Sequence, residues 1–247
     1  MMALSVAGYA VIETLHESAR TLVYRACGNG IAGTVILKLP KQDVAPQEPQ
    51  ARARREYGVL SRLHADGVIG VHALEKDQHR LVLVMEDPEG DSLASILRDR
   101  RLSLHEFLTL GIRIAEALGQ IHRHNVIHKD INPSNILWNP QRDLLKIIDF
   151  ELATELAREH LAVVSPTMLE GTLGYMSPEQ TGRMNRVVDY RSDLYSLGVT
   201  FYQMLTGVLP FRSGDPVEMV HCHLARTPRP PHEVDPAIPP LLSALVL

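Results

Sequence analysis

The segment His128-Lys-Asp-Ile-Asn-Pro-Ser-Asn135 decides the fold of this chain, together with Ile148-Asp-Phe150 downstream. Asn135 follows Asp130 by five positions, and Asp149 follows Asn135 by fourteen. Phosphoryl transfer from a nucleotide needs a carboxylate beside the attacking hydroxyl and oxygen ligands for Mg²⁺. Asp130 offers the carboxylate, and Asn135 and Asp149 offer the oxygen ligands.

A second part of this chemistry lies upstream, in Val35-Ile-Leu-Lys38. The stretch is apolar and β-branched, which predicts a strand with Lys38 near its end. We expect a helix over Ala51–His64, because its apolar residues recur at helical spacing. Glu56 lies four positions before Leu60 on the apolar face, where it can hold Lys38 in place. Lys38 can then neutralise the α- and β-phosphates of a nucleotide.

These pieces, in this order and spacing, resemble the protein kinase catalytic domain over roughly residues 9 to 247. The resemblance implies ATP and Mg²⁺ as cofactors and a protein hydroxyl as acceptor. It implies Asp130, Lys38 and Asn135 as catalytic residues, and Asn135 and Asp149 as metal ligands. It also implies a nucleotide site formed by Val23, Ile36, Lys38, Glu56, Met85, Glu86, Asp87 and Leu137.

Further motifs agree with this family. Gly171-Thr172, Tyr175 and Ser177-Pro-Glu179 resemble the peptide-docking end of an activation segment, and Asp193 resembles the buried helix aspartate that braces the catalytic loop. The segment Tyr175–Arg186 resembles a narrower subgroup, found at the N-terminus of large signalling proteins with ATPase, sensor and histidine kinase domains. Those neighbouring domains are therefore expected partners. Ser165 and Thr167 are either phosphorylation sites or ordinary loop residues.

The expected architecture is an α+β, two-lobed, protein-kinase-like fold. Residues 1–86 should form an antiparallel sheet with one helix, and residues 87–247 a mostly helical, incomplete lobe. We expect a loop over Pro40–Gln50, and prolines should break the structure after residue 215. The apolar run Leu241–Leu247 has no cap, which indicates a truncated helix. Strands are expected at Val11–Leu15, Thr21–Ala26, Thr34–Leu39 and Leu81–Met85.

In the second lobe, Ser103 and Glu106 form a capping-box pattern before a long helix. A hairpin is expected from Ile136–Trp138 and Leu144–Ile148, and a buried helix over Leu194–Leu205 that Gly207 ends. The apolar stripe of the long helix should contain Leu104, Phe107, Leu108, Ile112, Ala115, Leu118 and Ile121.

Composition excludes several classes of protein. The 247 residues are 45% hydrophobic and 22% charged, which is ordinary for a globular domain and excludes chain-wide disorder. The net charge of −4 does not favour a nucleic-acid partner. Two cysteines exclude a disulfide framework, and no apolar run approaches the ~20 residues of a membrane span. Residues 1–12 lack the basic region of a signal peptide, so we expect a cytoplasmic protein.

The chain departs from the kinase pattern in its phosphate loop. Aligned on Val23, the three glycine positions hold His16, Ser18 and Thr21. Their Cβ atoms should stiffen the loop or hold it away from phosphates, although the hydroxyls can still donate hydrogen bonds. We therefore expect weaker or differently posed nucleotide binding. Four more positions carry side chains unlike the family pattern: Ile36, Lys129, Asn132 and Glu151.

Three functions are consistent with these residues. The first is an active serine/threonine kinase. The second is a pseudokinase that binds nucleotide or holds neighbouring domains, which the altered loop, Ile36 and Glu151 favour. The third is a small-molecule phosphotransferase of the same fold, since Ile148–Glu151 is similar to the metal motif of that group. The peptide-docking motifs between Asp149 and Glu179 favour a protein substrate over this third function.

Overall fold

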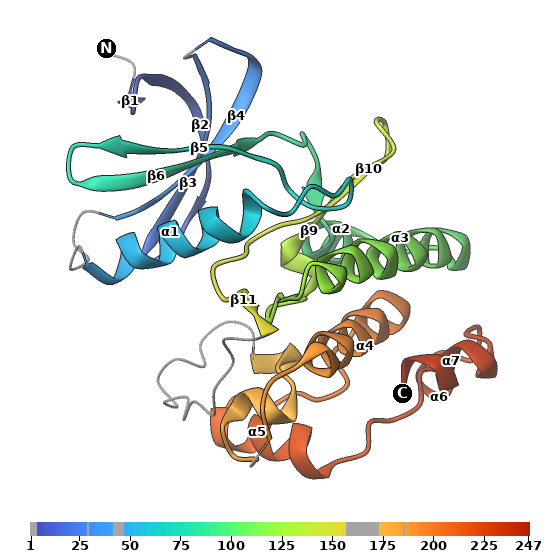
Figure 1. Ribbon diagram of the computed structural model, residues 1–247. Helices are drawn as coiled ribbons and strands as arrows, with labels where there is room; N and C mark the ends of the chain where they lie inside the picture. Colours follow the sequence, from blue (N-terminus) through green and yellow to red (C-terminus); the bar gives the residue numbers. More distant parts are fainter. Residues whose placement is uncertain (1–3, 29, 42–46, 157–172, 185) are drawn as a thin grey trace. The chain divides into compact units, whose positions relative to one another are not determined.

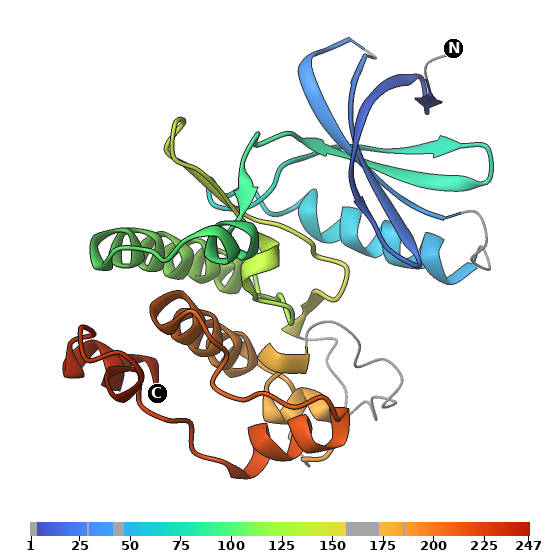
Figure 2. The same ribbon diagram turned by 180° about the vertical axis from the view of Figure 1, so that it is seen from behind.

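The computed structural model describes residues 4–28, 30–41, 47–156, 173–184 and 186–247. The chain forms two compact units, Met1–Glu89 and Gly90–Leu247 (Figures 1 and 2). The first unit is an antiparallel sheet with one helix, and the second is mostly helical, which confirms the expected fold class. The boundary after residue 86 stays a prediction about domains.

The sheet of the first unit has six strands in the order β1-β2-β3-β4-β6-β5, and every neighbouring pair is antiparallel. The four expected strands lie within β2, β3, β4 and β6. β1 and β5 are not apparent from the sequence, because β1 is short and β5 mixes apolar and charged residues without a clear alternation. The strands are β1 (Ser5–Val6), β2 (Tyr9–Glu17), β3 (Thr21–Gly28), β4 (Ile31–Pro40), β5 (Val71–Asp77) and β6 (Arg80–Glu86).

Strand register gives this sheet two distinct faces. Lys38 pairs with Val23 on β3 and with Leu83 on β6, whereas Ile36 pairs with Met85. Directly paired residues share a face, as do residues two apart on a strand. One face therefore presents the Lys38 side chain among apolar neighbours. The other face forms a closed core of Val6, Tyr9, Ala26, Val35, Leu37, Leu39, Val82 and Val84.

Helix α1 (Gln47–Leu60) packs on β5 and β6 within this unit (Figure 1). It begins inside the expected loop Pro40–Gln50, so that prediction was wrong for residues 47–50. Pro49 fits in the first turn, because the first N–H groups of a helix have no partner within it. The helix also ends before His64, because the N–H groups of Arg62 and Leu63 bond to carbonyls three residues back.

Among its described residues, the second unit contains three helices of ten or more residues, α3, α4 and α5, and several shorter elements. The expected hairpin is confirmed, with β9 antiparallel to β10 in a sheet that β7 extends. The strands of the second unit are β7 (Asp91–Ser92), β8 (Val126–Ile127), β9 (Ile136–Asn139), β10 (Leu144–Ile147) and β11 (Thr154–Glu155). Its helices are α2 (Leu93–Asp99), α3 (Leu104–Arg123), α4 (Tyr190–Thr206), α5 (Pro216–Ala225), α6 (Pro231–Val234) and α7 (Pro240–Val246). Short 3₁₀ turns occupy Pro133–Asn135, Leu173–Tyr175 and Pro178–Thr181.

The face that α3 buries differs from the expected stripe. Leu104, Leu108 and Ile112 are 42%, 43% and 60% exposed. Apolar residues lie on more than one side of this helix, so spacing alone does not select the buried side. Packing against α4 and β10 selects it, with Phe107 edge-on to Phe201 at 5.5 Å between ring centroids. The buried positions are Phe107, Leu110, Gly111, Ile114, Ala117, Leu118 and Ile121.

Helix α4 and the elements after it follow the expected pattern only in part. Gly207 ends α4 with φ 73°, a conformation that glycine adopts without strain, as predicted. The prolines after residue 215 do not simply break structure, because Pro216, Pro231 and Pro240 each begin a helix. Proline suits this position, since its fixed φ is helical and its missing N–H has no partner there. Within the described residues, no helix is long and apolar enough to cross a membrane.

The capping box at the start of α3 is present and gives a stability prediction. The Ser103 hydroxyl accepts the Glu106 N–H, and Glu106 Oε2 accepts the Ser103 N–H at 2.8 Å. Ser103→Ala should therefore lower the free energy of unfolding by about 1 kcal/mol. Thermal denaturation should show a melting point roughly 2–4 °C lower. Thr109→Ala, on the exposed face of the same helix, should leave it unchanged or slightly higher; equal melting of both variants would contradict the capping role.

Candidate active site

Lys38 and Glu56 form an ion pair in the first unit. Lys38 Nζ lies 3.0 Å from both carboxylate oxygens of Glu56. The Glu56 side chain is only 3% exposed, and α1 presents it to the face of the sheet on which Lys38 lies. A carboxylate this buried needs a partner, because an unpaired buried charge is costly. The pair holds the ammonium group at a defined place on the face of the sheet that also carries Val23, Ile36 and Met85.

Side-chain hydrogen bonds fix the segment that follows β6. The buried Asp87 carboxylate accepts the Nε–H of Arg25 at 2.5 Å, the Thr34 hydroxyl at 2.8 Å and the Glu89 N–H at 2.9 Å. Burial raises the pKa of Asp87, but these hydrogen bonds outweigh it and lower the pKa below its ordinary value. Arg25 also pairs with Glu13 of β2. Asp87 thus anchors this segment to β3 and β4.

Few backbone donors remain in the same segment. The Glu86 N–H donates to the Gly70 carbonyl at 3.0 Å, and the Glu86 carboxylate accepts the Gly70 N–H at 2.8 Å. Pro88 has no N–H. At Glu86 and Pro88 the segment therefore has no free N–H for a base. Met85, Glu86 and Asp87 are expected in the nucleotide site, and the missing N–H of Pro88 directly after them, which the sequence already shows, reduces the donors that this segment can offer to a base.

A tight turn replaces the glycine-rich loop between β2 and β3. The Ser18 hydroxyl accepts the N–H groups of Arg20 and Thr21, at 3.2 and 2.9 Å. The Ser18 N–H donates to the Thr21 carbonyl at 2.9 Å. Three backbone N–H groups are thereby used inside the turn. The expectation of a stiffened loop agrees with this geometry, and the Ser18 hydroxyl is engaged in the turn itself.

In the second unit, two amides hold the Asp130 carboxylate. Asn132 Nδ2 donates to Oδ1 at 3.0 Å, and Asn135 Nδ2 donates to Oδ2 at 2.8 Å. Asn132 Oδ1 in turn accepts the Ser134 N–H at 2.8 Å and caps the turn Pro133–Asn135. Burial raises the pKa of Asp130 above the ordinary carboxyl value, and the charge of Asp149 adds to this, whereas His128 and the two amides oppose it. The role of Asn132 in orienting Asp130 was missed from the sequence.

Asp193 of α4 holds the backbone of the catalytic loop, residues 128–135, in place. Its fully buried carboxylate accepts the N–H groups of His128 and Lys129, at 2.9 and 2.7 Å. His122 Nε2 donates to it at 2.8 Å. Lys129 has φ 68°, an unfavourable conformation for a non-glycine residue that surrounding contacts must hold. The expected bracing contact is thus present.

Two hydrogen bonds and one ring contact connect residues 148–150 to this loop. His128 Nε2 donates to the Ile148 carbonyl at 3.1 Å, and the Ile148 N–H donates to the Asn135 carbonyl at 2.9 Å. The fully buried Phe150 packs edge-on to His128, with ring centroids 4.7 Å apart. Asp149, between them, has φ 64°. The backbone around Asp149 is therefore specified by contacts with Asn135 and His128.

These contacts leave suitable atoms for a magnesium ion. Asn135 uses its amide nitrogen on Asp130, so its side-chain oxygen is the atom left to face a cation. Asp149 offers a carboxylate, and such oxygen ligands suit Mg²⁺. Among the described residues there is no group of three or more His, Cys, Asp or Glu side chains that could hold a metal. Asn135 and Asp149 would therefore hold a hard cation such as Mg²⁺, which would offset charge on a bound nucleotide.

The remaining predicted residues fall in several places. Leu137 lies half-buried on β9, opposite Lys146 of β10. Ser165, Thr167 and Gly171-Thr172 lie outside the described residues. Of the docking motif, Glu179 accepts the Ser192 hydroxyl of α4, and Gln180 donates to the Lys129 carbonyl at 2.7 Å. The Gln180 contact, which joins this segment to the catalytic loop, was not foreseen.

The family model for the protein kinase domain matches residues 9–241, and the chain belongs to the protein kinase family. It is 30% identical over 241 residues to a probable serine/threonine-protein kinase of Clostridium perfringens, covering 97% of this chain and 34% of that protein. It is 33% identical over 246 residues to a probable serine/threonine-protein kinase of Streptomyces coelicolor, covering 97% and 36%. The family resemblance drawn from the motifs is thereby confirmed, and neither alternative function gains support.

A solved structure shows the same fold. The kinase domain of Mycobacterium tuberculosis PknI, a point mutant, matches with a TM-score of 0.72 and 23% identity, covering 100% of this chain and 88% of that chain. The present chain spans about a third of the length of the two curated relatives described above.

Proposed function

We propose that this domain transfers the γ-phosphate of ATP to a serine or threonine hydroxyl of a protein. The observation that carries the proposal is the Asp130 carboxylate, which Asn132 and Asn135 orient while Asp193 holds its loop. The family of the chain and the names of its curated relatives support the same reaction.

The residues divide the reaction between them. Asp130 orients the acceptor hydroxyl and takes its proton as the oxygen bonds to the γ-phosphorus. The bond from that phosphorus to the β–γ bridging oxygen breaks, and ADP leaves. Lys38, held by Glu56, neutralises the α- and β-phosphates. Asn135 and Asp149 would hold Mg²⁺, which when bound offsets charge on the phosphates.

The altered phosphate loop should affect nucleotide affinity more than chemistry. With three N–H groups used inside the Ser18 turn, the loop has fewer donors for phosphates. We propose that ATP is bound weakly and held mainly by Lys38 and metal. Electrostatic positioning provides most catalysis of phosphoryl transfer, so loss of loop contacts does not abolish it.

The proposal also covers the location of the protein and the domains beside which it acts. Because ATP is the donor and Cys27 and Cys222 are free, we propose a cytoplasmic location. The relatives are about three times longer than this match, so we also propose that the domain acts beside further domains of a signalling protein. The ATPase, sensor and histidine kinase partners suggested by Tyr175–Arg186 belong to this proposal.

Transfer of labelled γ-phosphate to serine, threonine and tyrosine peptides tests the function. Wild-type protein with Mg²⁺ and ATP should label serine and threonine but not tyrosine. Lys38→Ala should lower the rate by roughly a hundredfold or more, because it removes a positioned charge from the phosphates. Lys41→Ala, which removes a surface ion pair with Glu17, is the matched control and should keep activity. Equal loss in both variants, or tyrosine labelling, would contradict the proposal.

A further inference from the structure

Gln180 lies in the docking turn, residues 177–181 of the second unit, and its side chain contacts the catalytic loop. Nε2 of Gln180 donates to the Lys129 carbonyl at 2.7 Å, across 51 positions of the sequence. Lys129 directly precedes Asp130, so the bond ends on the peptide group that leads into the proposed base. The docking turn and the base are therefore connected through this side chain.

The peptide group between Lys129 and Asp130 is held at both of its polar atoms. Gln180 binds the carbonyl oxygen, and the Asp130 N–H donates to His128 Nδ1 at 3.2 Å. Because a peptide group is planar, fixing both atoms fixes its plane and the direction in which the chain enters Asp130. His128 belongs to the catalytic loop itself, whereas Gln180 comes from the docking turn. Loss of the Gln180 bond therefore releases one of these two atoms.

The backbone of Lys129 is strained and should shift when this bond is lost. Lys129 has φ 68°, a conformation that a non-glycine residue keeps only where surrounding contacts hold it. Asp193 accepts the Lys129 N–H at 2.7 Å, and Gln180 holds the carbonyl of the same residue. If the carbonyl is released, Lys129 can relax toward ordinary backbone angles. That relaxation rotates the peptide group before Asp130 and with it the carboxylate.

The amide of Gln180 is itself oriented by the fully buried Ser177. Its Oε1 accepts the Ser177 N–H at 3.2 Å and the Ser177 hydroxyl at 2.9 Å. With the oxygen of the amide fixed in this way, Nε2 on its other side points at the Lys129 carbonyl. The neighbouring Glu179 accepts the Ser192 hydroxyl of α4, which anchors the turn. The donor is thus preorganised by the turn that carries it.

We propose that Gln180 is a positioning residue for phosphoryl transfer, which orients Asp130 from the docking turn through the Lys129 carbonyl. The expected effect on rate rests on the proposed kinase function, whereas the effect on the backbone of the catalytic loop does not. The docking turn and the base then act as one unit, so that the protein substrate meets a carboxylate already aligned by the segment on which it docks.

Gln180→Glu tests the role because it removes the donor and keeps the acceptor. A carboxylate has no N–H for the Lys129 carbonyl, but it can still accept both bonds from Ser177. The protein should stay folded, with a melting temperature at most roughly 2–4 °C lower. The kcat for a serine peptide should fall roughly tenfold, and the KM for ATP should stay unchanged, because Lys38 and Glu56 lie on other elements.

Two further variants separate the lost bond from the added charge. Gln180→Met has a similar length and adds no charge, but it also lacks the donor. It should lower kcat by a similar factor, again without a change in the KM for ATP. Gln141→Glu adds the same charge at an exposed position between β9 and β10, and it should keep the wild-type kcat.

Amide hydrogen exchange of the full chain tests the contact without any catalysis. Release of the Lys129 carbonyl should also weaken the bond from the Asp130 N–H to His128, since both atoms belong to one peptide plane. Exchange at the Asp130 N–H should therefore be several times faster in both Gln180 variants than in wild type. Exchange within α3 should be the same in all proteins.

The outcomes distinguish this proposal from the kinase assignment. Wild-type kcat in Gln180→Met, or an equal loss in Gln141→Glu, overturns the positioning role and leaves the kinase function standing. Unchanged exchange at Asp130 in both Gln180 variants also overturns it. In a protein that transfers no phosphate at all, faster exchange at Asp130 still supports Gln180 as the residue that holds Asp130, and the missing transfer counts against the kinase function alone.

Discussion

Asp130→Asn is expected to lower the rate of phosphoryl transfer by about a hundredfold or more, because an amide cannot accept the proton of the attacking hydroxyl. The size is the usual contribution of a positioned general base. The substitution also places an NH₂ group where a carboxylate oxygen accepts an N–H from Asn132 or Asn135. The precise pose of the loop should therefore relax as well. Initial rates with labelled ATP at saturating peptide measure the effect.

The interpretation of that experiment depends on two further measurements. The dissociation constant for ATP should change little, because Lys38 and Glu56 lie on other elements. The melting temperature should show that the protein remains folded at the assay temperature, although the lost hydrogen bond lowers it. Asp66→Asn, an exposed aspartate of the first unit, should keep full activity. If well-folded wild-type protein shows no transfer at all, the pseudokinase function becomes the better account. If Asp130→Asn retains full transfer, the protein is a kinase but Asp130 is not its base.

Asp193→Ala should unfold the protein at much lower denaturant concentration. The substitution leaves the N–H groups of His128 and Lys129 without acceptors beneath the loop, and each unsatisfied buried group costs about 1–3 kcal/mol. We expect the free energy of unfolding to fall by roughly 3 kcal/mol or more, with a matching loss of activity as Lys129 leaves its positive φ. Urea denaturation followed by circular dichroism measures the change.

Asp193→Asn provides a graded comparison. It keeps one oxygen for one of the two backbone N–H groups, so its loss of stability should lie between wild type and alanine. Asp66→Ala should leave the denaturation midpoint unchanged. A midpoint for Asp193→Ala within error of wild type would show that the loop is held by other contacts, such as the bond from Gln180 to the Lys129 carbonyl.

Much of the proposed active site could be predicted from the sequence for two reasons. Some of its residues lie close together in one loop, and others lie on a helix whose buried face follows from helical periodicity. Asp130 and Asn135 share one short loop, so five positions suffice to place them together. Glu56 could be placed on the buried face of α1 because helical periodicity depends only on neighbouring residues. Local rules also identified the Ser103 cap and the Gly207 end of α4.

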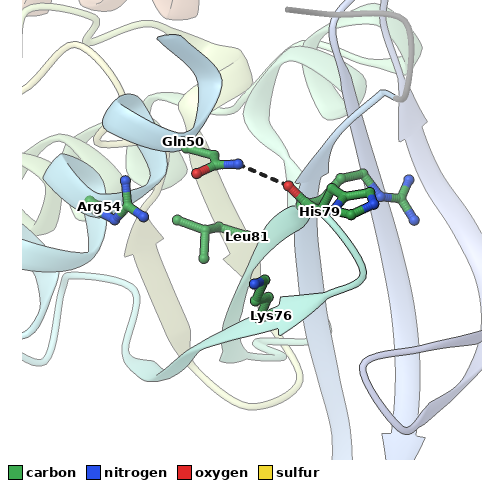
Figure 3. A pocket seen from close by; sticks show the side chains of 6 residues that line it. Gln50, Arg54, Lys76, His79 and Leu81 are labelled. Atoms are coloured by element: carbon green, nitrogen blue, oxygen red, sulfur yellow. Dashed lines mark hydrogen bonds between the residues drawn. The ribbon is translucent and has the colours of Figure 1, made fainter. Parts of the chain in front are cut away.

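Contacts between distant segments account for the features that spacing did not reveal. The buried face of α3 is selected by the elements that pack against it. The hydrogen bond from Gln180 to the Lys129 carbonyl and the ion pair between Arg25 and Asp87 also connect different elements. A pocket in the first unit likewise exists only where α1 meets β5 and β6 (Figure 3), and its lining residues are Gln50, Arg54, Lys76, His79, Arg80 and Leu81. Local periodicity carries no information about such pairings, because they depend on which surfaces meet when the elements pack. The protein kinase class could therefore be predicted from the sequence alone, as could the residues proposed for its reaction. The contacts that support those residues required the tertiary structure.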